Sequence, residues 1–195
     1  MPISDKYQII FIHIPKCAGE AVWALLGIDK KPYNLISFSP PVLQHLLPKQ
    51  LRGEYIPEEK WNAYKKITII RNPYDRVVSD YFWMQQGGWG FVEASFDEYL
   101  GTRETVVLQN SYSENMFYDH FYPLHFYFED IQFDHVIRYE SLEKGIAELR
   151  ELCQIENPLT KQNASERGSF VLNQEQKDRI YQMYERDFLD FGYER

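Results

Sequence analysis

Two turns in this chain have the residue types and spacing expected of anion-binding sites. In the first, Lys16 follows an apolar run and Gly19 comes three residues later. In the second, Arg71 ends another apolar run and Asn72-Pro73 follows it. The first N–H groups of a helix have no partner inside the helix, and together with the helix dipole they attract negative charge. A basic side chain at the same place adds to this attraction, so each turn predicts an anion site.

Each turn is expected to join a buried strand to a helix. Short apolar runs rich in β-branched residues predict strands over Tyr7–Ile14 and Ile67–Ile70. Apolar residues at helical spacing predict a helix over Gly19–Leu26. The helix after the second strand should begin with Asn72 as its N-cap and Pro73 in its first position, because both residues suit a helix N-terminus.

The rest of the chain continues this alternation. It predicts a third strand, a helix after it and a capped last helix, over Phe133–Tyr139, Leu142–Leu152 and Asn173–Gly192 respectively. Residues 29–63 are rich in proline and predict an irregular segment with one short helix around Val42–Leu47. After the second helix, Gln85–Gly90 predicts a glycine-rich break, and the polar and aromatic stretch from this break to about residue 130 is expected to be mainly helical.

Strands that alternate with helices indicate an α/β fold. We expect a three-layer sandwich around a central parallel sheet. The 195 residues suit one domain over 1–195 with a sizeable core, and a hydrophobic content of 44% excludes a disordered chain. The first turn is not a Walker A loop, because the chain has no GxxxxGK[ST] motif, and this disfavours an ATP-dependent kinase.

Composition and charge exclude several classes of partner. The formal net charge of −8 argues against nucleic acid. No apolar run reaches the roughly 18 residues of a membrane span, and the first residues do not form a signal peptide. Cys17 and Cys153 lie in unrelated contexts, and no metal-ligand cluster is visible in the sequence. We therefore expect a cytoplasmic protein with no membrane or nucleic-acid partner and no bound metal.

The second turn carries a resemblance to a known family. IIRNPYDRVVSDY is similar to the RNPxxRxxSxY motif that binds the 3′-phosphate in sulfotransferases dependent on PAPS (3′-phosphoadenosine-5′-phosphosulfate), in particular the bacterial and carbohydrate branch. FIHIPKCAGEA resembles that family's 5′-phosphosulfate loop, whose usual form is HIPKTGGTS. Weaker similarities follow in the same order at VIRYESL, Pro158–Asn163 and Asp187–Tyr193, so the resemblance covers most of the chain.

The resemblance implies a fold, a donor and a set of site residues. The fold would be that of the sulfotransferases, which is similar to the P-loop NTPases, and the donor would be PAPS. Lys16 would bind the 5′-phosphosulfate and stabilise charge on the bridging oxygen, while Arg71 and Ser79 would hold the 3′-phosphate. The other expected nucleotide-binding residues are the rest of the first loop and a polar loop after the third strand and its helix: Pro15, Cys17, Ala18, Gly19, Glu20, Ala21, Lys161, Arg167 and Ser169.

The first loop departs from the family pattern. Thr-Gly-Gly-Thr-Ser is replaced by Cys17-Ala18-Gly19-Glu20-Ala21, which removes hydroxyl donors and adds a carboxylate. Glu20 has three open interpretations: it points away and caps its own helix, it approaches the acceptor as a catalytic base, or affinity for PAPS has decayed.

The general base is a second open question. Sulfuryl transfer to a hydroxyl needs a group that takes the acceptor proton. His45 is the histidine nearest to the place where the resemblance would put this base. It is either aimed into the cleft or exposed on the surface, while His13 is expected to be structural. The aromatic and glycine-rich run Tyr81–Phe91 predicts either a lip that stacks against an acceptor or a packed turn.

The sequence therefore favours a sulfotransferase that moves a sulfuryl group from PAPS to a hydroxyl of a small-molecule or carbohydrate acceptor, without a metal. Two alternatives remain: a non-catalytic relative that binds nucleotide, and a nucleotide or small-molecule kinase on a similar strand-loop-helix plan.

Overall fold

The computed structural model describes residues 3–28, 45–87, 91–115, 117–157 and 170–195. Its centre is a four-stranded sheet in the order β1-β2-β3-β4. The strands are β1 Ile3–Ser4, β2 Ile9–Ile12, β3 Lys65–Ile70 and β4 His135–Arg138. β2, β3 and β4 are parallel, whereas β1 pairs antiparallel with β2. The predicted parallel sheet is confirmed for three strands, and β1 is a two-residue edge strand too short to leave a sequence pattern.

The register of the sheet brings the ends of the strands together. Ile12 of β2 lies opposite Thr68 of β3, and Ile70 of β3 lies opposite Arg138 of β4. All four residues of β2 and the last four of β3 are buried, which explains why both strands read as unbroken apolar runs. The turns that follow β2 and β3 therefore leave the sheet at the same edge.

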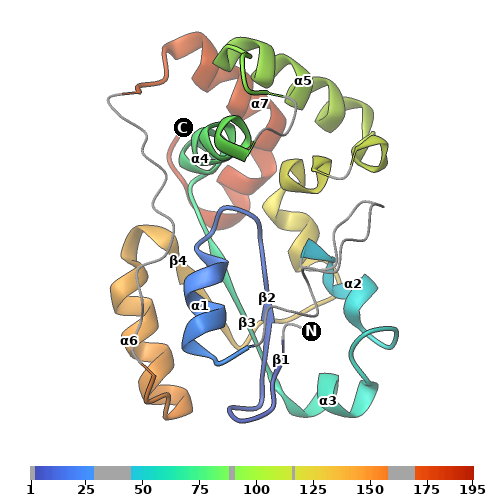
Figure 1. Ribbon diagram of the computed structural model, residues 1–195, viewed down its shortest axis with the longest axis vertical. Helices are drawn as coiled ribbons and strands as arrows, with labels where there is room; N and C mark the ends of the chain where they lie inside the picture. Colours follow the sequence, from blue (N-terminus) through green and yellow to red (C-terminus); the bar gives the residue numbers. More distant parts are fainter. Residues whose placement is uncertain (1–2, 29–44, 88–90, 116, 158–169) are drawn as a thin grey trace.

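Seven α-helices and four described 3₁₀ helices surround the described part of this sheet. The α-helices are α1 Gly19–Leu25, α2 Pro48–Leu51, α3 Glu58–Ala63, α4 Pro73–Gly87, α5 Phe96–Gln109, α6 Leu142–Cys153 and α7 Gln174–Phe191. The 3₁₀ helices are η2 Tyr112–Glu114, η3 Tyr118–Phe121, η4 Leu124–Phe128 and η5 Tyr139–Ser141. Figure 1 shows α1 and α6 on one side of the strands, α2 and α3 on the other, and α4, α5 and α7 beyond the carboxyl ends.

The helices predicted around the sheet are confirmed. α1, α4 and α6 begin at the predicted residues. α7 has the predicted capping box, in which the Asn173 side chain accepts from the Gln176 N–H, and Gly192 ends it in a left-handed conformation at φ 64°. Local capping rules are therefore reliable in this chain.

Residues 45–63 are less irregular than predicted, because they contain the helices α2 and α3. The short helix expected over Val42–Leu47 is wrong where the structure describes it, because His45–Leu47 contain no α-helix and α2 begins at Pro48. Proline is favoured in the first position of a helix, which explains this start. α3 was not predicted, and its one buried residue, Trp61, attaches it to the core.

The stretch before residue 130 is less α-helical than predicted. α5 is capped by Ser95 and ends at Asn110 in a left-handed conformation. Beyond it the chain forms only the short helices η2, η3 and η4. Pro123 interrupts this stretch. The aromatic side chains of the stretch pack in several directions at once, so no long amphipathic helix forms.

Candidate functional site

The first predicted turn joins β2 to α1 through an uncommon backbone conformation. Lys16 and Ala18 both lie in the left-handed region, with φ values of 65° and 60°. Residues that carry a Cβ rarely adopt this region, and each instance costs on the order of 1 kcal/mol or more. Other contacts must therefore hold this turn in place, and strain of this kind clusters at binding sites.

Two arginines of the second motif supply those contacts. Arg71 Nη1 donates to the Lys16 carbonyl at 3.0 Å, and Arg76 Nε donates to the Pro15 carbonyl at 3.1 Å. The other two nitrogens of the Arg76 guanidinium donate to the Tyr122 carbonyl at 2.7 Å and the His120 carbonyl at 3.1 Å. The two predicted anion turns are thus joined directly, and η3 is tied to both.

Gly19 has a packing role that the sequence did not reveal. A Cβ at this position would lie 2.0 Å from His13 Cδ2 and 2.1 Å from His13 Nε2. The imidazole of His13 therefore occupies the space of the missing side chain. His13 also contacts Trp23 and His45 edge-on, at ring-centroid distances of 5.3 and 5.1 Å. The structural role expected for His13 is consistent with this position.

The remaining side chains of the first loop differ in exposure. Cys17 and Ala21 are buried, so these predicted nucleotide contacts would have to come from the backbone. Burial raises the pKa of the Cys17 thiol to about 11, against the opposing charges of Arg76 and Arg71, so the thiol is neutral and not a nucleophile. Glu20 is exposed in the first turn of α1.

The second turn combines a local helix cap with contacts from the segment after β4. The Asn72 side chain accepts the Tyr74 N–H at 2.9 Å, which confirms Asn72 as the cap of α4. Glu140 Oε1 accepts the backbone N–H of Asn72 at 2.6 Å. The Arg71 guanidinium lies 3.8 Å from the centre of the Tyr139 ring, a stacked cation–π contact. Tyr139 and Glu140, which directly follow β4, thus support the second turn.

The other predicted nucleotide-binding residues are less closely placed. Ser79 is buried on α4, and among the described residues no hydrogen bond joins it to Lys16 or Arg71. Lys161, Arg167 and Ser169 lie outside the described residues. The structure therefore brings Lys16 and Arg71 together and leaves the contributions of the other four residues as predictions.

The amine of Lys16 lies beside an aromatic surface. Lys16 Nζ is 5.0 Å from the centre of the Trp83 ring, and Trp83 stacks on His120 at 4.7 Å. Residues 81–87 of the run Tyr81–Phe91 belong to α4 and form no turn; Tyr81 is buried against Phe96, whereas Trp83 reaches the first turn. Residues 88–90 lie outside the described part.

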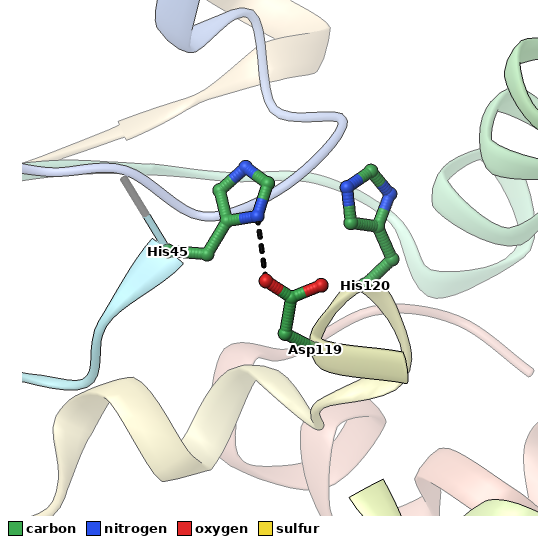
Figure 2. A group of neighbouring side chains, drawn as sticks. All are labelled: His45, Asp119 and His120. Atoms are coloured by element: carbon green, nitrogen blue, oxygen red, sulfur yellow. Dashed lines mark hydrogen bonds and ion pairs between the residues drawn. The ribbon is translucent and has the colours of Figure 1, made fainter. Parts of the chain in front are cut away.

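Figure 2 shows His45, Asp119 and His120 gathered beside the first turn, where His45 and η3 meet. His45 Nδ1 and Asp119 Oδ2 are 2.9 Å apart, and the rings of His45 and His120 are in edge contact at 4.8 Å between centroids. All three side chains are buried. The predicted base candidate is thus an interior residue, and the interpretation of His45 as a surface histidine is wrong.

The surroundings of His45 favour its neutral form. Burial lowers the pKa of His45 below its ordinary value of 6.5, because the charged imidazolium loses hydration, and the opposing effect of Asp119 is smaller. At neutral pH the imidazole is therefore uncharged. An ionised carboxylate accepts the proton on Nδ1, which leaves the lone pair on Nε2, the orientation seen when a carboxylate positions a histidine base.

His120 and Asp80 form a second His–Asp pair next to that of His45 and Asp119. Asp80 Oδ1 is 2.6 Å from His120 Nδ1, and Asp80 Oδ2 accepts from Arg103 at 2.9 Å and from the Tyr99 hydroxyl at 2.8 Å. Burial alone would raise the pKa of Asp80, but His120 and Arg103 outweigh it and hold the pKa well below its usual range. Asp80 is therefore ionised and fixes the orientation of the His120 ring.

Sequence reasoning missed most of the residues that organise this site. They share one property, which is that each acts on a partner far along the chain: Arg76, Asp80, Trp83, Asp119 and His120. Arg76 stands in the RNPxxRxxSxY motif, so its position was a usable signal. His45 and Asp119 are 74 residues apart, and no local pattern connects them.

The chain matches one protein family over nearly its whole length. A family model described as the sulfotransferase family matches residues 1–194. This chain belongs to the sulfotransferase family. No curated protein and no solved structure matches it. Family membership makes the protein a transferase that moves sulfuryl groups, and it confirms the resemblance found in the sequence.

In the described part of this sulfotransferase, none of the helices combines the length and the apolar character that a membrane crossing requires.

Proposed function

We propose that this sulfotransferase transfers the sulfuryl group of PAPS to a hydroxyl group of a small-molecule or carbohydrate acceptor. PAPS carries negative charge at a 3′-phosphate and at a 5′-phosphosulfate, so its binding requires two neighbouring cationic sites. The observation that carries the proposal is the 3.0 Å hydrogen bond from Arg71 Nη1 to the Lys16 carbonyl, which joins the two turns.

The donor set fits such a nucleotide. Lys16 offers a mobile point charge, and Arg71 offers a planar guanidinium that suits a phosphate. Both follow parallel strands at the carboxyl edge of the sheet, where ligands of open α/β sheets bind. Ser79 would add a hydroxyl from α4. Lys161 and Arg167, outside the described residues, stay expected contributors.

PAPS supplies an activated sulfuryl group attached to a phosphate that leaves. Negative charge grows on the bridging oxygen as the bond from sulfur to that oxygen breaks and a bond from sulfur to the acceptor oxygen forms. The Lys16 amine would stabilise this charge, which is the role that preorganised cations take in group transfer. The strained turn and its two arginine contacts would hold Lys16 for this purpose.

His45 would accept the proton of the acceptor hydroxyl on Nε2. Asp119 keeps the proton of the ring on Nδ1, and burial keeps the imidazole neutral at pH 7. Glu20 is exposed, which supports the interpretation that it points away from the anion and is screened by water. It therefore stands as an alternative base of lower rank.

The test is PAPS turnover without free metal. The protein is incubated with PAPS, EDTA and a panel of phenolic and sugar hydroxyl acceptors, and the release of 3′-phosphoadenosine-5′-phosphate and sulfated product is followed by mass spectrometry. We expect release that Lys16→Ala lowers by about 10²–10³-fold. Magnesium-dependent ATP consumption without PAPS turnover would favour a kinase instead. Binding without turnover for any acceptor would favour a non-catalytic relative.

A further inference from the structure

His45, Asp119 and His120 form a group that the transfer reaction does not fully explain. One ligand atom from each side chain lies within 4.8 Å of the others, and all three side chains are buried. His120 has no assigned part in the transfer, although its ring contacts that of His45. Two imidazoles and one carboxylate are a donor set typical of divalent transition metals such as Zn²⁺.

His120 has the second contact that metal-binding histidines usually make. Its Nδ1 is held by Asp80 at 2.6 Å, and Asp80 is itself fixed by Arg103 and Tyr99. In Figure 2 the other ring nitrogen of His120 faces the side of His45 and Asp119. A carboxylate that binds one nitrogen of a histidine fixes the tautomer and raises the basicity of the other, as in carboxylate–histidine–zinc groups.

We propose that His45 Nδ1, Asp119 and His120 Nε2 bind Zn²⁺ or a similar transition-metal ion, and that this binding inhibits sulfuryl transfer. Zinc takes nitrogen and carboxylate ligands at about 2.0–2.2 Å, so ligand atoms around it stand roughly 3.3–3.5 Å apart. The widest pair of ligand atoms, at 4.8 Å or less, closes by up to about 1.4 Å on binding, and the 2.9 Å pair of His45 Nδ1 and Asp119 Oδ2 opens by about 0.5 Å. Mg²⁺ and Ca²⁺ prefer oxygen ligands and are disfavoured.

Inhibition follows from the tautomer of His45. Without metal, Nδ1 carries the proton that Asp119 accepts and Nε2 carries the lone pair. With metal on Nδ1, the proton of the neutral ring is on Nε2, which then cannot accept a proton from an acceptor hydroxyl. The inhibition rests on the proposed function, because it takes His45 as the base. Metal binding itself does not depend on the proposed function.

Titration of chelator-treated full-length protein with ZnCl₂ by calorimetry, and with CoCl₂ by visible absorption, tests the binding. We expect one Zn²⁺ per chain and the d–d bands of a low-coordinate Co²⁺ site with nitrogen ligands. His120→Gln should weaken both metals at least tenfold. Its backbone carbonyl, which Arg76 and Arg103 contact, is retained in this variant. Asp80→Asn should weaken them by about 10–100-fold through loss of the second contact.

The matched control is His125→Gln. His125 pairs with Asp187 at 2.7 Å but belongs to no three-ligand group in the described part of the chain. This variant should bind both metals as the wild type does. Equal loss in the two histidine variants, or no saturable Zn²⁺ binding in the wild type, would overturn the inference. Thermal melts of every variant exclude loss of fold as the cause.

Activity distinguishes this inference from the proposed function. If both hold, Zn²⁺ suppresses PAPS turnover, EDTA restores it, and metal concentrations that inhibit the wild type leave residual turnover of His120→Gln unchanged. Zinc binding without any affinity for 3′-phosphoadenosine-5′-phosphate would overturn the proposed function and leave the metal site standing. Nucleotide binding without zinc binding would overturn the metal site and leave the proposed function standing. Zinc binding that leaves turnover unchanged would overturn the inhibition.

Discussion

The two turns of this sulfotransferase are held in different ways. In the second, Asn72, Pro73 and the start of α4 follow local rules for a helix N-terminus. In the first, Lys16 and Ala18 adopt left-handed conformations that their side chains disfavour. Its stability comes from distant residues, above all Arg71 and Arg76. A local turn can therefore act as the rigid support for a strained one.

The difference also concerns chemistry. The second turn presents a buried guanidinium stacked on Tyr139, which suits a fixed phosphate. The first presents Lys16, partly exposed, beside Trp83 and the histidines. Binding is expected to depend mainly on the second turn and the rate of transfer on the first.

The largest effect is expected for Lys16→Ala. Loss of a cation that stabilises developing charge should lower turnover by about 10²–10³-fold, while affinity for the nucleotide product falls much less. Single-turnover release of 3′-phosphoadenosine-5′-phosphate from PAPS measures it. Lys49→Ala removes a lysine near Glu129 on the surface and should leave turnover unchanged. Equal turnover in Lys16→Ala and wild type would refute the role of the first turn.

Arg76→Met tests whether Arg76 stabilises the first turn. The substitution leaves the carbonyls of Pro15 and Tyr122 without the buried donor that now serves them, whereas the His120 carbonyl keeps its hydrogen bond from Arg103. We expect the free energy of unfolding in urea to fall by about 3 kcal/mol. Arg186→Met breaks an exposed pair with Asp190 and should cost about 0.5 kcal/mol or less. A similar cost for both would mean that Arg76 does not brace the first turn.

Gly19→Ala tests the close approach of His13. The added methyl would meet the imidazole at 2.0 Å, so we expect a loss of about 1–3 kcal/mol in the free energy of unfolding. The double variant with His13→Ala should recover part of this loss, since the obstacle is then removed. If the double variant is no more stable than the sum of the single effects predicts, another contact causes the strain.

Asn72→Ala should cost about 1 kcal/mol of stability by removing the cap of α4. Asn62→Ala, at an exposed position in the last turn of α3, is the control and should cost little, because alanine has the higher helix propensity. Chemical denaturation of both variants measures the difference. A smaller loss for Asn72 than for Asn62 would contradict local control of the second turn.

The pH dependence of turnover should be the mildest effect. The pKa of His45 is lowered by burial, so the base is already neutral at pH 6.5 and becomes protonated only as the pH falls further. The acid limb of kcat/KM is therefore expected below pH 6.5, with little change between pH 7 and 8, and should be absent in His45→Gln. A limb centred above pH 7 would exclude His45 as the base.

The second turn could be predicted from the sequence because its determinants are local. A buried strand, an N-cap, a proline in the first position and capping boxes act over three or four residues, and the helices they start were predicted correctly. The same rules missed α3 and misplaced α2, which are too short to show a clear pattern. They also missed β1.

The histidine group and the first turn could not be predicted in the same way. The turn with left-handed Lys16 and Ala18 is held by Arg71 and Arg76, more than 50 residues away in sequence, which donate to the carbonyls of Lys16 and Pro15. His45 meets Asp119 across 74 residues, and Arg76 ties η3 to the first turn through the carbonyls of His120 and Pro15. The lysine was visible in the sequence, but the network around it depends on tertiary contacts.

The central claim is that both turns bind one nucleotide, and calorimetry with 3′-phosphoadenosine-5′-phosphate in the presence of EDTA tests it most directly. We expect micromolar binding that needs no magnesium and is lost in Arg71→Ala, while Arg52→Ala, which removes an exposed arginine paired with Glu58, should bind like the wild type. No binding by the wild-type protein, or binding that Arg71→Ala leaves unchanged, would contradict it.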